Sequence, residues 1–481
     1  MKKTKVAALA AAALIAATTV GALAGCGGDS EHTITVFLLA NNTETQFYEE
    51  YFDYMEEVLA EEGLNYKIEF NSEQETNYYD LLLADIQGGN TPDIFYVRPN
   101  ELMQYKDHIV SLQDYADGAG KAYANLNDIY ETALNMYRFN PETGKLGDPK
   151  DDLWAFPKDL STQQLGYYKP LLEKFQTEIK AKDNSKGTGK LKMPWEMDYK
   201  TENYTWDDYK TICETIANSS NKAQNEYASD VPSIEILAKS FSSDKSSTTS
   251  PLIDLTNGRA NATVNDLKSG AMQKAIEYQA GLIDCGGANY AGATYSAFTA
   301  KRVCFYGAVG SWEITDYNRL LGENGEWGVM PWPTEDGSTE WQGLITSAGY
   351  VVSSECAAME KGDVAKRIAI SFMSSYTQNQ MVRVKKISLP LLKSSEEDYR
   401  SNNETYTPAT RGVFLDVVSG AHGFFPAKYS TYDADWIKAL SDDLELVWNE
   451  GAGGALAKYN STDWAATKSK MQTRYDATKN N

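Results

Sequence analysis

Polar side chains with complementary hydrogen-bonding chemistry stand directly after predicted strands in the first hundred residues. They are Asn41 and Asn42 after the apolar run 34–39, Glu73 after 66–70, and Arg98 after 93–97. Amide, carboxylate and guanidinium groups together supply both donors and acceptors. A cluster of this kind binds a small polar ligand by hydrogen bonds, provided that the fold brings the strand ends together.

The elements between these strands predict such a fold. Apolar and aromatic residues recur at helical spacing from Tyr48 to Leu59 and again from Tyr79 to Ile86. The alternation of strands and helices is typical of a mostly parallel sheet covered by helices. Ligands of such sheets bind beyond the carboxyl ends of the strands. We therefore expect the polar residues above to share one edge.

A second set of α/β signals follows, without any internal repeat. It comprises short strands at 153–157 and 165–169 around a polar turn at 161–164, a helix that begins at Thr205, strands at 303–309, 327–332 and 350–352, and helical stripes near 364–376, 434–448 and 463–475. Trp312 follows Gly310 and Ser311 at the end of one of these strands. A tryptophan there either packs in the core or presents its face to a ligand.

No catalytic or metal-binding motif accompanies these residues. The three histidines, His32, His108 and His422, lack the close spacing of a zinc or copper site, although carboxylates alone suit calcium. Cys213, Cys285, Cys304 and Cys356 are scattered, so they form either one or two disulfides or buried free thiols. We expect no cofactor and no resident metal.

The first 25 residues have the pattern of a secretory signal peptide. Lys2, Lys3 and Lys5 precede an almost uncharged run of small and apolar residues, which ends at Leu23-Ala24-Gly25-Cys26. This ending resembles the lipobox of bacterial lipoproteins, which implies lipid on Cys26 and a flexible tether over 26–32. A plain signal peptide or a membrane-spanning anchor is the alternative interpretation.

Composition and charge exclude several classes of partner. The chain has 481 residues and a formal net charge of -22. Such an acidic chain lacks the basic face that nucleic-acid binding requires, and it does not adhere to an anionic membrane by charge. Tyrosine is the commonest aromatic residue, with 31 copies, and its polar handle suits both cores and wet binding surfaces.

Seven strings in one order identify a family resemblance that covers nearly all of the chain after the signal segment. They are LLADIQGGNTPDIFYV ending at Val97, LWAFPKDLSTQQLGYYKPLLEKF at 153–175, YTWDDYKTICETI at 204–216, FTAKRVCFYGAVGSW at 298–312, WGVMPWP at 327–333, SAGYVVSS at 347–354, and AKRIAISFMSSYTQNQMV at 365–382. The set resembles the extracellular solute-binding proteins of bacterial carbohydrate ABC importers, the maltose-binding-like family. Each string alone is weak, and their order carries the resemblance.

The resemblance implies a two-lobed, periplasmic-binding-protein-like α/β fold of type II, with the ligand in a cleft between lobes joined by three crossing segments. We expect the crossings near 158–165, 338–346 and 400–412. Lobe one then combines 33–161 with 343–405, and lobe two combines 162–342 with 406–481. The loops at 181–204 and 335–343 depart from the simpler family pattern, so their roles stay open.

The resemblance also singles out ligand-binding candidates. The predicted ligand-binding residues are Trp312, Tyr96, Arg98, Asn41, Asn42, Glu73, Trp341, Gln342 and Phe424. Trp312 stands where the family places a stacking tryptophan, and Tyr96 and Arg98 stand where it places ligand residues of lobe one. For Trp341 and Gln342 the alternative is packing at the hinge, and for Phe424 it is the core of lobe two.

The resulting functional expectation is a receptor tethered to the extracytoplasmic face of a bacterial cell membrane. It captures a sugar or oligosaccharide as a monomer, delivers it to the permease subunits of an ABC importer, and breaks no bond. Two alternatives stay open. The same fold can take a polyamine, phosphoester or peptide, and an extracellular glycoside hydrolase requires only two suitably spaced carboxylates.

Overall fold

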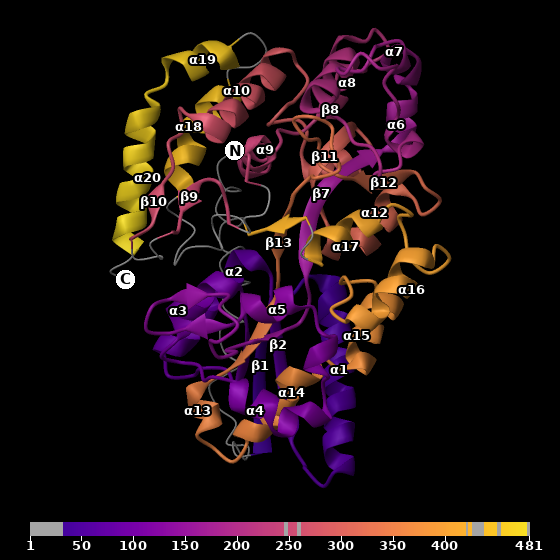
Figure 1. The fold of residues 1–481 in the computed structure, drawn as a ribbon. Coiled ribbons are helices and arrows are strands. Elements are labelled where there is room, and N and C mark those ends of the chain that lie inside the picture. Colours follow the sequence, from indigo (N-terminus) through magenta and orange to yellow (C-terminus); the bar gives the residue numbers. More distant parts are fainter. Residues whose placement is uncertain are drawn as a thin grey trace, which may run out of the picture.

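The structure is a computed structural model, and it describes residues 32–244, 249–256, 261–419, 422–425, 437–449 and 454–478. The predicted signal segment, Cys26 and all but the last residue of the tether lie outside the described residues. Figure 1 shows two lobes, each built around its own sheet and covered by helices.

The sheet of lobe one has the strand order β2-β1-β3-β14-β6. The strands are β1 (Thr33–Leu39), β2 (Lys67–Glu73), β3 (Ile94–Val97), β6 (Phe156–Pro157) and β14 (Gly349–Val352). The first three are parallel, as the sequence predicts, and β14 runs antiparallel to β3 and β6. Its helices are α1 (Asn42–Glu61), α2 (Glu75–Gln87), α3 (Leu102–Tyr105), α4 (Gln113–Asp117), α5 (Glu131–Met136), α13 (Ser354–Ala357) and α14 (Gly362–Ser371).

The sheet of lobe two has the order β15-β13-β7-β11-β8, and β12 also pairs with β7. The strands are β7 (Ser161–Tyr168), β8 (Tyr227–Ser229), β11 (Val303–Gly310), β12 (Trp327–Met330), β13 (Gly343–Thr346) and β15 (Gly423–Phe424). The larger helices around it are α8 (Trp206–Asn218), α9 (Ile234–Phe241), α10 (Gly270–Asp284), α12 (Ile314–Leu321), α17 (Gly412–Val418), α18 (Lys438–Asn449), α19 (Ala455–Ser461) and α20 (Trp464–Thr478). The last three helices lie on the outer side of this lobe (Figure 1).

Strand β7 differs from the prediction, which places a polar turn at 161–164. The strand begins at Ser161 and includes these residues, and Thr162 and Gln164 are completely buried. They are polar but not exposed, because β7 lies between β13 and β11 and its side chains find partners inside the lobe. For example, the Gln164 amide donates to the Thr162 hydroxyl at 3.0 Å.

The chain passes between the two sheets at 158–160, from β6 into β7, and again at 347–348, from β13 into β14. The first passage lies inside the expected crossing. The second lies just beyond the expected 338–346, because residues 343–346 form β13 and pair with β7. The boundary of lobe one therefore falls after Thr346 and not at 343. Helix α16 (Glu396–Ser401) lies beside both lobes, since Tyr130 and Arg400 both bond to Glu396 while Arg400 also pairs with Asp416.

Candidate binding site at the facing edges of the two sheets

The strand order places the ends of both sheets next to the crossings. In lobe one, Gly349 follows the second crossing directly and pairs with Val97, the last residue of β3. The carboxyl ends of β1, β2 and β3 therefore face lobe two. In lobe two, Gln163 lies near the start of β7 and pairs with Gly310, the last residue of β11. Residues around Gln163 and Gly310 therefore face lobe one.

Arg98 lies at this edge of lobe one with its charge already engaged. Its guanidinium is 2.5 Å from a carboxylate oxygen of Glu75, and it lies 5.5 Å from the ring centroid of Tyr79. The Arg98 backbone N–H donates to Glu101 at 2.6 Å. Burial raises the pKa of Glu101 to about 7, although Arg98 acts in the opposite direction. Arg98, whose side chain is mostly buried, is therefore held in place through both its guanidinium and its backbone N–H.

Asn41 caps a helix at the same edge. Its side-chain oxygen accepts from the backbone N–H of Glu44 at 2.9 Å, and the Glu44 carboxylate accepts from the N–H of Asn41 at 3.1 Å. This reciprocal pair is a capping box at the start of α1. Asn42 is exposed and Glu73 is half-buried at the end of β2. Asn42 is therefore the most accessible of the polar groups predicted from strands one and two.

Trp312 occupies the edge of lobe two. It lies in a 3-10 turn directly after β11, it is half-buried, and its indole lies against Gly310. A side-chain carbon on Gly310 would lie 2.7 Å from the ring, so glycine is required for this close approach. The neighbouring Glu313 accepts from the Tyr317 hydroxyl at 2.7 Å, and burial raises the pKa of its carboxyl.

A pocket of about 130 Å³ opens at the same end of the second sheet. Its polar lining comes from Gln163 on β7, Asp230 directly after β8, and Ser233 before α9. Gly307 and Trp332 complete the wall beside Asp230. The indole nitrogen of Trp332 is buried and has no hydrogen-bond partner among the described residues. The pocket thus combines an aromatic wall with groups that both donate and accept hydrogen bonds.

Asp230 is the functional candidate that the sequence prediction missed. Both of its carboxylate oxygens accept from the backbone N–H of Gly307, at 2.9 and 3.0 Å. Burial raises the pKa of Asp230 to about 7, and no ion pair with Lys, Arg or His reaches it within the described part of the chain. The available signal was the short run Tyr227–Ser229 before Asp230 and Pro232, which is a strand followed by a turn.

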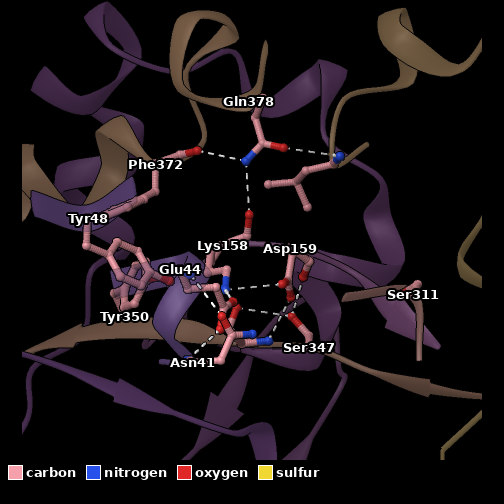
Figure 2. Close-up of polar contacts among 12 residues, drawn as sticks. Asn41, Glu44, Tyr48, Lys158, Asp159, Ser311, Ser347, Tyr350, Phe372 and Gln378 are labelled. Atoms are coloured by element: carbon pink, nitrogen blue, oxygen red, sulfur yellow. Dashed lines mark hydrogen bonds and ion pairs between the residues drawn. The ribbon is translucent and has the colours of Figure 1, made fainter. Parts of the chain in front are cut away.

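The two crossings are joined by a cluster of buried charges, which we call the hinge cluster: Asn41, Glu44, Lys158, Asp159 and Ser347 (Figure 2). The Lys158 ammonium is 2.6 Å from Glu44 and 3.5 Å from Asp159. From the second crossing, the Ser347 hydroxyl donates to the Asp159 carbonyl at 2.6 Å. Burial acts to lower the pKa of Lys158, but the charge of Glu44, with Tyr48 and Asp159, outweighs it and raises the pKa well above the ordinary value.

Further hydrogen bonds tie the hinge cluster to the residues that follow α14 and to the second crossing. The amide of Gln378 donates to the carbonyl of Lys158 at 2.9 Å and to that of Phe372 at 2.8 Å (Figure 2). The backbone N–H of Ala348 donates to the Asp159 carboxylate at 3.1 Å. Both crossings are therefore held by buried hydrogen bonds where they leave lobe one.

Four predicted binding residues do not present their side chains at the site. Phe424 is completely buried in β15, and the Lys239 ammonium lies over its ring, so the prediction for Phe424 is wrong and the core alternative holds. Trp341 is 2 % exposed and stacks on His422 with ring centroids 4.4 Å apart. Trp341 and the buried Gln342 precede β13, whose other end leads to the crossing, so they lie away from it. Tyr96 packs edge-to-face on Tyr78 and is 7 % exposed.

The described residues contain no group of three or more His, Cys, Asp and Glu side chains arranged to hold a metal ion. Cys213, Cys285, Cys304 and Cys356 are free thiols. None of the helices in the described ranges has the length and apolar character that a membrane span requires.

Comparison with known proteins gives a family match. The model of a family described as bacterial extracellular solute-binding protein matches residues 54–398, which is more than half of the chain. No curated protein sequence matches it. The matched range contains Arg98, Asp230 and Trp312, and both crossings described above.

Solved structures share the fold over almost the whole chain. An ABC substrate-binding protein from Listeria monocytogenes, solved with cycloalternan, has a TM-score of 0.64 at 14 % identity and covers 93 % of this chain and 99 % of its own. The GacH receptor of Streptomyces glaucescens, solved unliganded and with acarbose, has a TM-score of 0.64 at 16 % identity, with 93 % and 98 % covered. The sugar-binding protein MalE from Xanthomonas citri has a TM-score of 0.62 at 15 % identity, with 93 % and 97 % covered. At sequence identities this low, the similarity to these structures shows a shared fold and nothing about the ligand.

Proposed function

The chain belongs to the family of bacterial extracellular solute-binding proteins, and we propose that its solute is a sugar or oligosaccharide, held between the lobes. We further propose that the protein hands this ligand unchanged to the permease subunits of an ABC importer. Two structural neighbours were solved with cycloalternan or acarbose and a third is a sugar-binding protein, which supports this choice.

The observation that carries the proposal is the position of Trp312 directly after β11, at the end of the lobe-two sheet where the pocket also opens. A sugar ring has C–H groups on its faces and hydroxyls around its edge. The half-buried indole of Trp312 suits a face, and Gln163, Asp230 and Ser233 offer acceptors and donors to hydroxyls in the pocket at the same end of the sheet. A ligand on Trp312 is therefore within the part of lobe two that faces lobe one.

Lobe one supplies the second half of such a site. Asn42, Glu73 and Arg98 lie at the edge of its sheet that faces lobe two. A ligand that bonds to both edges favours the arrangement in which the lobes approach, because only that arrangement satisfies both sets of groups. A micromolar Kd corresponds to about -8 kcal/mol, which is enough to favour closure and still permit release.

The proposed membrane attachment rests on the sequence alone. Cys26 follows the lipobox-like Leu23-Ala24-Gly25, so we propose that it becomes the lipid-bearing first residue of the mature protein. Mass spectrometry of the protein extracted from its own membrane tests this. A C26S variant should lose the acyl mass and appear in the medium, and an N-terminus other than residue 26 in the wild type would contradict the proposal.

The sugar proposal is tested by calorimetry on a panel of glucose-, galactose-, mannose- and xylose-based di- and trisaccharides, with spermidine, glycerol phosphate and a tripeptide as non-sugar probes. We expect one sugar series to bind saturably and to be recovered intact. Trp312→Ala should weaken its binding by about 2 kcal/mol, because a stacked indole loses its contact area. Trp195→Ala is the matched control, since Trp195 is half-buried against Tyr167 and Lys169 at the other end of β7.

Two results would contradict the sugar proposal. One is saturable binding of a non-sugar probe with no response to any sugar. The other is equal affinity of Trp312→Ala and Trp195→Ala for the same sugar, which would remove Trp312 from the site. Release of a shorter sugar during the titration would instead favour a hydrolase.

A further inference from the structure

We propose that Asp230 determines which class of sugar the protein accepts. In this proposal, which rests on the function above, the carboxylate of Asp230 requires a hydrogen-bond donor from the ligand at the pocket of lobe two. Neutral sugars with a free hydroxyl at that position bind, sugars with a carboxylate there are rejected, and binding releases a proton from the protein.

The first argument is the number of unfilled acceptor positions. A carboxylate accepts about four hydrogen bonds. Asp230 receives one backbone N–H, that of Gly307, which both oxygens share. The Ser229 hydroxyl is 3.4 Å from one oxygen, while it lies 2.7 Å from the Asp230 carbonyl. The Asp230 carboxylate therefore keeps unused acceptor capacity, and it lines the pocket of lobe two. Because buried polar groups normally have hydrogen-bond partners, we expect a ligand donor to use this capacity.

The second argument is the absence of a compensating charge among the described residues around Asp230. The groups whose pKa responds to its charge are Tyr209 on α8, Tyr306 on β11 and the thiol of Cys213 on α8. Burial raises the pKa of all three, so each is neutral at pH 7.

The charged residues of α9 are engaged elsewhere. On this helix, which packs against the pocket, Glu235 accepts from the Ser250 hydroxyl. Lys239 donates to the Asp244 carbonyl at 2.9 Å and lies over the ring of Phe424. Within the described ranges the pocket therefore presents an acceptor with no cation beside it, which favours donors and repels a second carboxylate.

The third argument is the close approach of the Trp332 ring to the backbone at Gly307. A side-chain carbon at this position would lie 2.4 Å from the ring of Trp332 and 3.4 Å from a carboxylate oxygen of Asp230. The register of β11 against β7 shifts between Tyr306 and Val309, so a bulge places Gly307 at the pocket wall. Glycine thus permits the Trp332 ring to pack directly on the strand beside the Asp230 carboxylate, so the aromatic wall and the acceptor of the pocket lie next to each other.

The proton release follows from the same geometry. A hydroxyl that donates to Asp230 binds its ionised form, so the ligand lowers the pKa of the carboxyl from its value of about 7 in the free protein. At pH 7 about half of the free protein must then lose a proton on binding. Affinity should fall as the pH decreases below about 7, because the protonated carboxyl first has to give up its proton.

The experiment compares the wild type with Asp230→Asn, using the neutral galactose and glucose oligosaccharides of the panel and the galacturonate and glucuronate oligomers of the same linkage. Asparagine keeps an oxygen for the Gly307 N–H but has no charge. Glu323→Gln is the charge control, because Glu323 is exposed in the same lobe. Calorimetry in phosphate and in Tris at pH 5.5 to 8.5 separates the proton release from the binding heat.

We expect the wild type to bind a neutral oligosaccharide, to reject its uronate counterpart, and to release about half a proton at pH 7. Asp230→Asn should bind the neutral sugar at least about tenfold more weakly, with no proton release assigned to this pocket. Glu101 in lobe one also has a pKa of about 7, so the difference between the two proteins isolates Asp230.

Failure of this inference is distinct from failure of the proposed function. If the wild type binds neutral sugars but Asp230→Asn binds them equally well and releases the same protons, the role of Asp230 is refuted and the sugar function stands. If the wild type binds uronates more tightly than neutral sugars, the inference is also refuted. If no sugar binds at all, the proposed function fails.

Discussion

Two aspartates show how differently this protein treats charge in its two polar regions. Asp159 belongs to the hinge cluster, 3.5 Å from the Lys158 ammonium, and its carboxylate accepts from the Ala348 N–H. Asp230 lines the pocket of lobe two and accepts from Gly307 without an ion-pair partner among the described residues. Burial raises the pKa of both carboxyls, and only for Asp159 does a cation, Lys158, oppose it.

The contrast separates a region that holds geometry from one that is prepared for a ligand. Buried charges with partners on several segments fix the relative positions of those segments, and removing one partner leaves the others uncompensated. A buried acceptor that is only partly satisfied costs folding free energy, and a ligand donor recovers part of that cost. We therefore expect substitutions in the hinge cluster to lower stability, and those in the pocket to lower affinity without lowering stability.

The largest expected effect is at Lys158. Lys158→Met keeps the length of the side chain but leaves the buried carboxylates of Glu44 and Asp159 without their cation. Breaking a buried ion pair in this way costs about 3 to 5 kcal/mol of unfolding free energy. Urea unfolding monitored by fluorescence measures the loss.

Lys145→Met is the matched control for this substitution. The Lys145 ammonium is 3.0 Å from Asp148 on the surface, with the lysine side chain 62 % exposed. Exposed pairs contribute about 0 to 1 kcal/mol. If the two variants unfold at the same urea concentration, the hinge cluster does not fix the crossings, and the distinction drawn between the two regions fails.

The second largest expected effect is a gain in unfolding free energy when the charge of Asp230 in the pocket is removed. The pKa of Asp230 is about 7 in the folded protein and near 3.8 when unfolded, so the folded state binds the proton more tightly. Protonation of Asp230 therefore contributes most to the unfolding free energy below about pH 4, and this contribution is lost as the pH rises to about 7. Asp230→Asn removes this loss.

At pH 8, Asp230→Asn should be more stable than the wild type by roughly 2 kcal/mol, which is less than the full shift implies because Asp230 is partly exposed. At pH 4 the two proteins should be nearly equal. Urea unfolding at both values measures the difference. A variant that is less stable at pH 8 would show that the Asp230 carboxylate serves the fold and not a ligand.

The sequence predicted the regular part of the molecule well because that part depends on local patterns. The parallel strands β1 to β3 and the capping box of Thr205 and Asp208 follow from hydrophobic spacing and from neighbouring residues alone. For the same reason the strand ends at Asn42, Glu73 and Arg98 were placed at the correct edge. Their contact with a ligand stays a prediction.

The features that the sequence did not predict depend on contacts between segments that are distant along the chain. Phe424 looked accessible in a Gly-containing loop, but its two-residue strand pairs with β13 and becomes core. Trp341 was placed at a crossing that in fact begins six residues later, after β13. Asp230 was missed since the strand before it has three residues, and its pocket forms only when β8 and β11 come together. No local spacing contains that information.

The smallest expected effect is the loss of unfolding free energy on substitution of Asn41. This residue was predicted to bind the ligand, but its contacts connect it to the hinge cluster. Its side-chain oxygen caps α1 through Glu44, and the Glu44 carboxylate also accepts from Lys158 at 2.6 Å. Loss of such a cap costs about 1 kcal/mol. Asn41→Ala should therefore lower the unfolding free energy by about this amount, and Asn41→Ser should restore most of it.

Sugar affinity decides to which region Asn41 belongs. If its oxygen serves the cap, both variants should bind the panel's sugar within about threefold of the wild type, which is under 1 kcal/mol. A loss of affinity as large as that of Trp312→Ala, in a variant whose stability is unchanged, would show that Asn41 exchanges its cap for the ligand. The hinge cluster would then be in direct contact with the bound sugar, because Glu44 joins Asn41 to Lys158.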